Sequence, residues 1–336
     1  MPETARVRVS DPGAMLTTIP LLMGFQPADG DTVLLGVSVT GRVISLARFD
    51  AGCARQITAP EVQATLASVR AAGVSSAFLI GYGKDVTPAI DRIRGLVSGQ
   101  LPVRDSLRVE GNRYWSYQCH DLACCPAEGR EFPAESAAST TLRAAGLTAA
   151  SSRQDLADRI AGPTGDRAEA ADRAWQQAAA SPMTIAQGRQ AVQAALAASY
   201  QGRQLGDDEL ARLATAMRHL EVRDDAWARM TPDKADQHQA LWADAVRRLP
   251  EKAAAAPATL LAWTAWQKGD GPLANLALDR AFAADPGYSM AALLQEALSA
   301  GLAPSHAVPP MTPEQVADSY RERRQVQADP ENQPEA

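Results

Sequence analysis

The sequence has few lysines, few cysteines and no long apolar segment. Only four of its 33 basic residues are lysines, and the formal net charge is −6 at pH 7. Nucleic-acid binding requires clustered lysine and arginine side chains that replace the counterions around phosphates. This charge balance therefore argues against a nucleic-acid partner.

The amino-terminal residues lack the basic and then apolar pattern of a secretory signal peptide. The most apolar early segment, residues 15–25, contains Pro20 and is too short to cross a bilayer. We therefore expect a cytoplasmic protein with no membrane partner. Its four cysteines are too few for a disulfide framework, and cytosolic thiols stay reduced unless they are catalytic or bind a metal ion.

Length and composition predict a globular protein with two domains. The chain has 336 residues, of which 46% are hydrophobic and 21% are charged, whereas a typical domain has about 100–200 residues. A chain of this length can bury roughly three quarters of its unfolded surface without disulfides or metal ions. A bound metal ion would therefore serve local geometry or chemistry, and the hydrophobic core would not depend on it.

Strand and helix patterns alternate over residues 1–130, which predicts a mixed α/β sheet domain. Helices are expected to begin at Pro12, near Thr58 and at Thr87, because proline or a capping residue suits the first turn of a helix. The segment 77–80 is continuously apolar, as expected of a strand that is covered on both faces. The expected strands are residues 6–9, 32–37, 42–47, 77–80, 107–109 and 114–117.

Strand patterns stop after residue 130, and residues 131–302 have the apolar periodicity of helices. We therefore expect an α+β protein, in which a mixed α/β sheet domain over residues 1–130 is followed by an all-helical domain over residues 131–302. Residues 303–336 are rich in proline and charged side chains, so we expect a largely mobile tail there.

Within the helical domain, residues 260–301 resemble one helix pair of a tetratricopeptide repeat. Ala274, Leu278, Ala281 and Pro286 have the spacing of its second helix and closing turn. No second copy follows at a period of about 34 residues, and stable arrays usually need about three or more copies. A single tetratricopeptide-like pair within a larger helical domain is the expected structure.

Three of the four cysteines, Cys119, Cys124 and Cys125, lie within seven residues. With His120 they supply the four ligand types that zinc prefers. Their spacing is unfavourable for zinc, because neighbouring side chains on an extended strand point to opposite faces. Alternatively, Cys119 and Cys124 could face each other across a turn and form a disulfide, or all three could pack as small apolar side chains. These alternatives stay open at the level of the sequence.

A second candidate site follows the expected strand at residues 77–80. Gly81, Gly83 and Lys84 form a glycine-rich turn before a helix, where backbone N–H groups could bind an anion. Arg104 and Asp105 could lie beside this turn. The turn is not a phosphate-binding loop, because Lys84 is followed by an aspartate and the upstream glycine is missing. An ordinary strand-to-helix turn is the alternative.

Several motifs are distributed along most of the chain. They are Ser10-Asp11-Pro12, residues 19–29, residues 79–83, Val103-Arg104-Asp105, Trp115-Ser116-Tyr117, Cys119, Cys124-Cys125-Pro126, residues 222–227, His238 with Leu241-Trp242, and residues 269–291. In combination they resemble the mainly actinobacterial family known as domain of unknown function 4192, up to about residue 304. The resemblance implies a family but no activity. The family tends to have serine where this chain has Gly30, so we do not expect a serine nucleophile there.

Two functions are consistent with these observations. In the first, a cytoplasmic interaction or regulatory protein binds a protein partner through its helical half. In the second, an enzyme or small-ligand sensor uses the α/β half, with a metal or thiol site at Cys119–Cys125. Catalytic residues and cofactors are unknown, and zinc is one candidate ion for the cysteine cluster. We favour the first function, because the sequence has no recognisable pair of nucleophile and base.

Overall fold

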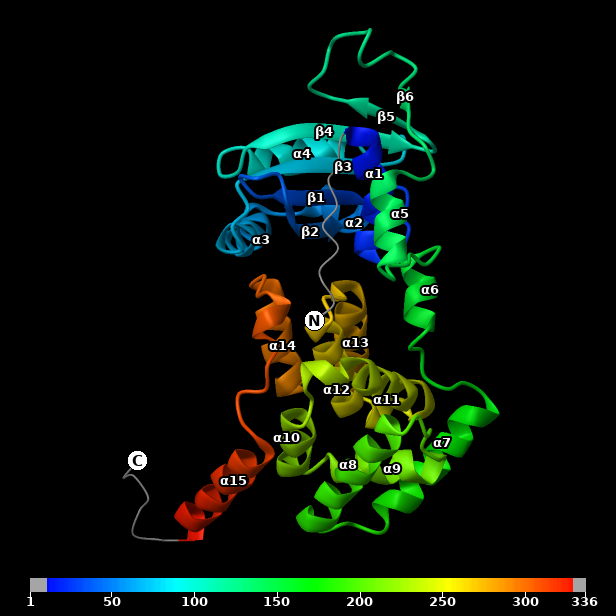
Figure 1. Cartoon of the computed structure of the whole chain (residues 1–336), viewed down its shortest axis with the longest axis vertical. Helices are drawn as coiled ribbons and strands as arrows, with labels where there is room; N and C mark the ends of the chain where they lie inside the picture. Colours follow the sequence, from blue (N-terminus) through cyan, green and yellow to red (C-terminus); the bar gives the residue numbers. More distant parts are fainter. Residues whose placement is uncertain (1–10, 329–336) are drawn as a thin grey trace. The chain divides into compact units, whose positions relative to one another are not determined.

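The computed structural model describes residues 11–328, which fall into two compact units (Figure 1). The amino-terminal unit extends to Leu156 and also includes Glu296–Ala303. The helical unit comprises Ala157–Gln295 and the residues from Pro304 onward. The amino-terminal unit thus reaches beyond the boundary predicted at residue 130.

A six-stranded mixed sheet forms the amino-terminal unit, with the order β2-β1-β3-β4-β5-β6. Strands β3 and β4 are parallel, and the other neighbouring strands are antiparallel. The predicted strands are present, apart from residues 6–9, which lie outside the described residues. The strand bounds are β1 Thr32–Val37, β2 Val43–Phe49, β3 Ser76–Tyr82, β4 Val103–Glu110, β5 Arg113–Ser116 and β6 Arg130–Glu131.

Helices α2 (Ala51–Gln56), α3 (Ala59–Ala71) and α4 (Thr87–Val97) cover one face of this sheet. Leu34 and Leu79 of the sheet share a buried apolar cluster with side chains of these helices. The other face carries α1 (Pro12–Met23), nearly all of whose residues are buried. Successive side chains along a strand point to opposite faces of the sheet. A strand residue that faces α1 is therefore adjacent in sequence to one that faces α4.

Helix α1 begins where the sequence predicts it. The Asp11 side chain accepts a hydrogen bond from the Ala14 N–H at 2.8 Å, and Pro12 occupies the first turn. Helix α5 (Ala137–Ala144) packs against α1, and the hydroxyls of Thr17 and Ser136 are hydrogen-bonded at 2.7 Å. This packing explains why the amino-terminal unit includes residues that the sequence assigned to the helical domain.

The helical unit is built from helices α7 to α13, most of α14, and α15. None of the helices in residues 11–328 is long and apolar enough to cross a membrane. The helix bounds are α7 Asp166–Ala179, α8 Ile185–Tyr200, α9 Asp207–Ala216, α10 Leu220–Ala228, α11 Ala235–Arg248, α12 Ala255–Gln267, α13 Gly271–Ala284, α14 Ser289–Ser299 and α15 Pro313–Ala328, and the short α6 (Arg153–Asp158) spans the division between the units.

The expected helix pair is formed by α12 and α13, which pack against each other. The two helices are joined by residues 268–270, and the Asp270 side chain caps α13 by accepting from the Leu273 N–H at 3.1 Å. Ala262 and Ala277 are fully buried. Small side chains at such positions allow the backbones of paired helices to approach closely.

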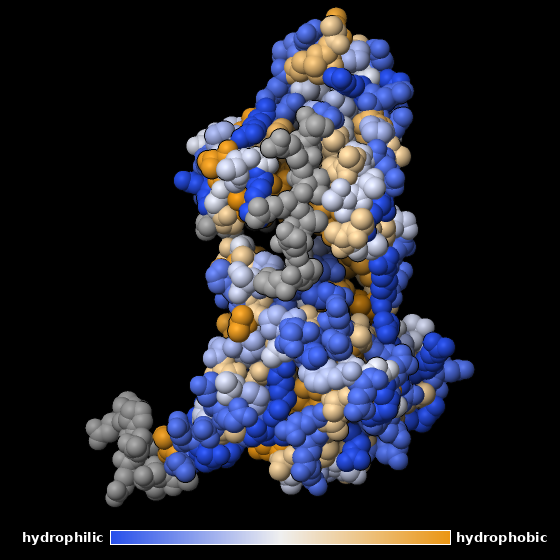
Figure 2. Space-filling view, viewed as in Figure 1, coloured by the Kyte–Doolittle hydropathy of each residue, from blue (hydrophilic) through white to orange (hydrophobic). Residues whose placement is uncertain are grey.

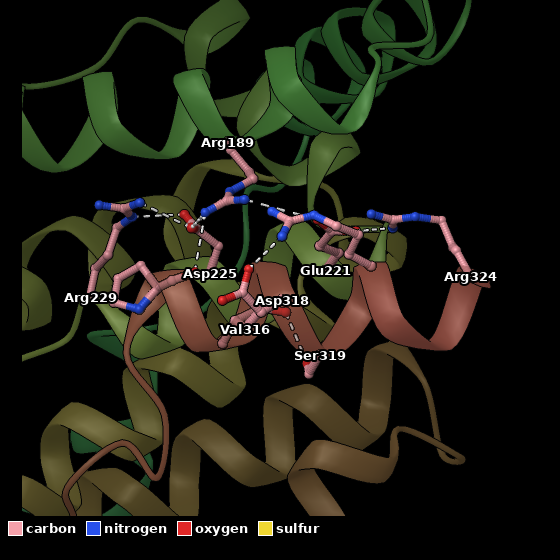
Figure 3. A network of polar contacts seen from close by, with 10 residues as sticks. Arg189, Glu221, Asp225, Arg229, Val316, Asp318, Ser319 and Arg324 are labelled. Carbon is pink, nitrogen blue, oxygen red and sulfur yellow. Dashed lines mark hydrogen bonds and ion pairs between the residues drawn. The ribbon is translucent and has the colours of Figure 1, made fainter. Parts of the chain in front are cut away.

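Helix α15 lies in the segment that the sequence analysis predicted to be a largely mobile tail. It packs on α10, where the Tyr320 hydroxyl donates to the Asp224 carboxylate at 2.6 Å and Arg324 forms an ion pair with Glu221. Val316 is buried in this contact (Figure 3). The polar side chains that suggested a mobile tail in the sequence therefore form part of the contact that holds α15 on α10.

Asp225 of α10 is the most deeply buried acid of this polar network (Figure 3). Its side chain is 0% exposed, and it accepts hydrogen bonds from Arg189 at 2.9 Å and from Arg229 at 2.7 Å and 3.0 Å. Arg189 also donates to the Pro313 carbonyl at 3.3 Å. Asp225 therefore connects helices α8, α10 and α15.

We predict that Asp225→Ala lowers the free energy of unfolding by about 3 kcal/mol, because it leaves two guanidinium groups without their buried partner. Chemical denaturation monitored by circular dichroism measures this loss. Asp318→Ala is the matched control, since Asp318 pairs with Arg321 on the exposed side of α15 and should contribute less than about 1 kcal/mol. Equal losses in the two variants would contradict the prediction.

His238 of α11 is 0% exposed, and burial lowers its pKa to about 4. Its Nε2 atom lies 3.5 Å from the Tyr200 hydroxyl. The folded protein holds a neutral imidazole, whereas the unfolded chain takes up a proton below pH 6.5. Stability from this group is therefore complete above pH 6.5, falls as the pH decreases to 4, and is constant below that value.

We expect the free energy of unfolding to decrease by up to about 3 kcal/mol between pH 6.5 and 4 because of His238. Denaturation curves over this pH range, compared between wild type and His238→Gln, isolate the contribution. His219→Gln, which changes an exposed histidine, should keep the wild-type pH dependence. A pH dependence that His238→Gln leaves unchanged would refute this assignment.

Candidate functional site

The three clustered cysteines converge in the loop between β5 and β6, residues 117–129, which we call the thiol loop. The Sγ atoms of Cys119, Cys124 and Cys125 all lie within 4.8 Å of one another. The loop extends from the end of the sheet in Figure 1. Figure 2 shows apolar and hydrophilic residues side by side over this part of the unit. His120 is exposed and does not join the three sulfur atoms.

The cysteines can converge because the segment that carries them is a turn and not a strand. The backbone N–H groups of Cys124 and Cys125 both donate to the Asp121 carbonyl, at 3.1 Å and 2.6 Å. The Asp121 carboxylate also accepts from the Ala123 N–H at 2.9 Å. The sequence analysis considered the cysteine spacing unfavourable for zinc because it assumed an extended chain. The turn at Asp121 removes that objection.

Asp105 and Ser116 hold the start of the thiol loop. The Ser116 hydroxyl donates to the Asp105 carboxylate at 2.8 Å and 2.9 Å. The same hydroxyl oxygen accepts from the backbone N–H groups of Gln118 at 3.1 Å and Cys119 at 3.0 Å. Burial raises the pKa of Asp105, and the hydrogen bonds from Ser116 and from backbone N–H groups oppose this shift. Asp105 thereby orients the first of the three cysteines.

Trp115 and Arg113 hold the other end of the thiol loop. The Trp115 indole N–H donates to the Ala127 carbonyl at 3.0 Å, and Arg113 donates to the Gly129 carbonyl at 2.9 Å. Gly129 has a φ of +82°, and a Cβ atom at this position would lie 2.5 Å from the Trp115 ring. Only glycine allows the chain to pass this close to the indole. Polar contacts thus fix a loop that buries few apolar side chains.

Two of the three thiols, Cys119 and Cys125, differ in their affinity for protons. A hydrogen bond from the Cys125 thiol, and a second one from the backbone of Asp121, lower the pKa of Cys119. Partial desolvation and hydrogen bonds to the neighbouring sulfur atoms raise the pKa of Cys125 to about 12. The Arg130 guanidinium lies 3.9 Å from the Cys124 sulfur. Cys119 is therefore more readily deprotonated than Cys125, and thiolate is the form that binds metal ions.

The structure does not bring all residues of the predicted glycine-turn site together. In the parallel pairing of β3 and β4, Gly81 faces Arg108, whereas Asp105 faces Phe78. Arg104 and Asp105 therefore lie roughly 10 Å further back along the strands, at about 3.3 Å per residue. Asp105 belongs to the base of the thiol loop, and Arg104 is exposed.

The turn itself is poorly suited to an anion. The Gly83 N–H already donates to the Val109 carbonyl at 2.7 Å, and Lys84 is exposed. The sequence analysis correctly predicted a turn after β3, but its backbone donor at Gly83 is used within the sheet. The Gly83 N–H is therefore not available to an anion.

A pocket of about 280 Å³ lies at the carboxyl ends of β3 and β4. Sequence reasoning missed most of its walls, because they come from five separate segments. Its lining residues are Leu16, Thr17, Pro20, Gln26, Pro27, Asp29, Tyr82, Gly83, Val109, Gly111, Phe132, Ala134 and Arg143. The motif at residues 19–29 was the sequence feature that could have indicated this pocket, because four of the lining residues come from it.

One comparison with known proteins identifies the family. The family described as domain of unknown function (DUF4192) matches residues 12–305. The chain belongs to this family. The match covers the sheet, the thiol loop and the helices as far as α14, so the DUF4192 region includes both candidate sites. No curated protein and no solved structure matches the chain.

Proposed function

We propose that the amino-terminal unit is a metal-binding module that binds a soft metal ion, such as Zn²⁺ or Cu⁺, through Cys119, Cys124 and Cys125. The observation that carries the proposal is the convergence of three Sγ atoms within 4.8 Å. Thiolates are the ligands that such ions prefer. The proposal assumes the reducing cytoplasm predicted from the sequence, where cysteines remain thiols.

The spacing of the sulfur atoms supports this function. Zinc binds thiolates at about 2.3 Å in a tetrahedral arrangement, which separates the ligating sulfur atoms by about 3.8 Å. The widest separation in the cluster is at most 4.8 Å, so it exceeds this value by no more than about 1 Å. A change of side-chain rotamers within the thiol loop can make up this difference.

Three protein ligands leave one coordination position of a tetrahedral ion open. A water molecule there would give the arrangement of catalytic zinc sites, whereas rotation of the exposed His120 would complete a closed structural site. The Arg130 guanidinium near Cys124 would partly neutralise the negative charge of the three thiolates. The module could therefore serve an enzyme or a metal sensor.

The same geometry favours a second candidate function, reversible thiol oxidation. Cys119 could form a disulfide with Cys124 or Cys125 by exchange with an oxidised dithiol partner. The two cysteines would lose two protons and two electrons, and the partner's disulfide would gain them. A protein partner of the helical half, which the sequence analysis favoured, stays a prediction.

The metal proposal predicts about one metal ion per chain in full-length protein purified without added metal. Elemental analysis measures this ratio. The variant with Cys124→Ser and Cys125→Ser should lose the ion, whereas Cys53→Ser should retain it, because Cys53 is an exposed cysteine of α2 outside the cluster.

Two results would contradict the metal proposal. Wild-type protein that is metal-free, has four titratable thiols and takes up neither Zn²⁺ nor Cu⁺ would exclude the metal function, and failure of an oxidised dithiol to convert two of these thiols to a disulfide would exclude the second function. Metal-free protein in which two thiols of the cluster are already oxidised to a disulfide would support thiol oxidation instead. Mass spectrometry of alkylated protein identifies the oxidised pair.

Asp105→Ala and Ser116→Ala should each weaken Zn²⁺ binding about 10–100-fold, because groups that orient metal ligands typically have effects of this size. Competition with a chromophoric chelator measures the affinity, and the thiol count should remain at four. Arg104→Ala, an exposed neighbour of Asp105, is the matched control and should bind as wild type does. Wild-type affinity in both Asp105→Ala and Ser116→Ala would show that the contact between these residues does not orient the site.

A further inference from the structure

The pocket at the carboxyl ends of β3 and β4 contains no cysteine, and its chemistry differs from that of the thiol loop. Ligands of sheets with parallel strands usually bind at this edge. Leu16, Pro20, Val109 and Phe132 supply apolar walls, while Asp29 and Arg143 supply opposite charges. With a volume of about 280 Å³, the pocket is at the lower end of the size range of small-molecule sites.

The Asp29 carboxylate is held at the pocket by a rigid loop. After Asp29, Gly30 donates its N–H to the Tyr82 carbonyl at 2.7 Å, and Tyr82 donates its own N–H to the Asp31 carbonyl at 2.9 Å. Gly83 has a φ of +100°, and a Cβ atom there would lie 3.3 Å from the Asp29 carboxylate. Glycine thus lets the acid lie against the end of β3.

Asp29 differs from its neighbour Asp31 in having a charge that is not neutralised. Asp31 is buried and forms an ion pair with Arg48 at 3.2 Å. Asp29 is exposed, and within residues 11–328 the structure records no hydrogen bond or ion pair of its carboxylate. A carboxylate that lines a pocket in this way can accept hydrogen bonds from an ammonium group.

Arg143 supplies the opposite charge from α5. Its Nε atom lies 3.5 Å from the Glu135 carboxylate, and this is the one ion pair recorded for it in the described part of the chain. The two terminal nitrogens of the guanidinium are the groups that bind a carboxylate in a bidentate manner. The hydrogen bond between Thr17 and Ser136 fixes α5 on α1, so Arg143 stays at the pocket.

Tyr82 lines the pocket, and its buried hydroxyl is a polar group that the protein itself does not satisfy. Its hydroxyl is buried and has no hydrogen-bond partner among the described residues. Burial raises the pKa of Tyr82, so the hydroxyl remains protonated and can donate a hydrogen bond. Most buried polar groups have a partner, so this hydroxyl is an exception, but it is closed off from solvent and does not itself face the pocket.

We propose that this pocket binds a free amino acid or a zwitterion of similar size, with its ammonium group at Asp29 and its carboxylate at Arg143. The apolar walls surround the side chain of the ligand. This site is independent of the metal site, because no residue is shared between them.

The experiment uses the full-length protein and the twenty common L-amino acids, each tested alone at millimolar concentration. At least one of them should raise Tm by several degrees, because a ligand that binds only the folded protein stabilises it. Isothermal titration calorimetry then gives its Kd. The amine and the carboxylic acid that correspond to this amino acid, each lacking one charged group, should bind at least about tenfold more weakly.

Asp29→Asn and Arg143→Gln should each raise the Kd at least about tenfold. Asp85→Asn and Arg104→Gln remove the same charges from exposed positions that do not line the pocket, and they should leave the Kd unchanged. An unchanged Tm in the absence of ligand shows that all four variants fold.

Three results would overturn the proposal. The first is that none of the twenty amino acids changes Tm. The second is that the amine alone binds as tightly as the amino acid, which would mean that Arg143 does not contribute. The third is that the pocket variants bind as their controls do, which would place the ligand elsewhere on the protein.

Discussion

The parallel pairing of β3 with β4 decides which residues can meet in the amino-terminal unit. Its register places Tyr82 beside Val109 at the carboxyl ends of the two strands, and Phe78 beside Asp105 nearer their amino ends. The pocket forms at the carboxyl ends. Nearer the amino ends, the Asp105 carboxylate accepts a hydrogen bond from Ser116 of the antiparallel β5. The register of β3 and β4 thus places the candidate ligand-binding residues and the thiol loop at different parts of the sheet.

The thiol loop shows how a segment with little apolar burial can still hold a defined geometry. Leu122 is 72% exposed, so the loop gains little from the hydrophobic effect. Ser116 fixes its start, the Asp121 carbonyl winds its centre, and Trp115 and Arg113 fix its end. Loops of this length without secondary structure are uncommon in compact domains. The polar contacts thus hold a segment in which three sulfur atoms lie within 4.8 Å of one another.

The sequence predicts most elements of this fold because their signals are local. The strand expected at residues 32–37 matches β1, and Asp11 with Pro12 starts α1 as expected. Convergence of the cysteines could not be predicted, because the bonds to the Asp121 carbonyl depend on the path of the loop. The pocket was missed for a similar reason. Leu16 and Arg143 are far apart in sequence, and they meet only because α5 packs on α1.

The attachment of α15 has a consequence for the conditions in which the protein is handled. Charged and hydroxyl groups make much of its contact with α10, including Arg324 with Glu221 and Tyr320 with Asp224. The Arg324 side chain is 52% exposed, so dissolved ions can approach this pair and screen it. Concentrated salt should therefore loosen the carboxyl-terminal helix before it affects the apolar core, and dilute buffers should hold the helix most firmly.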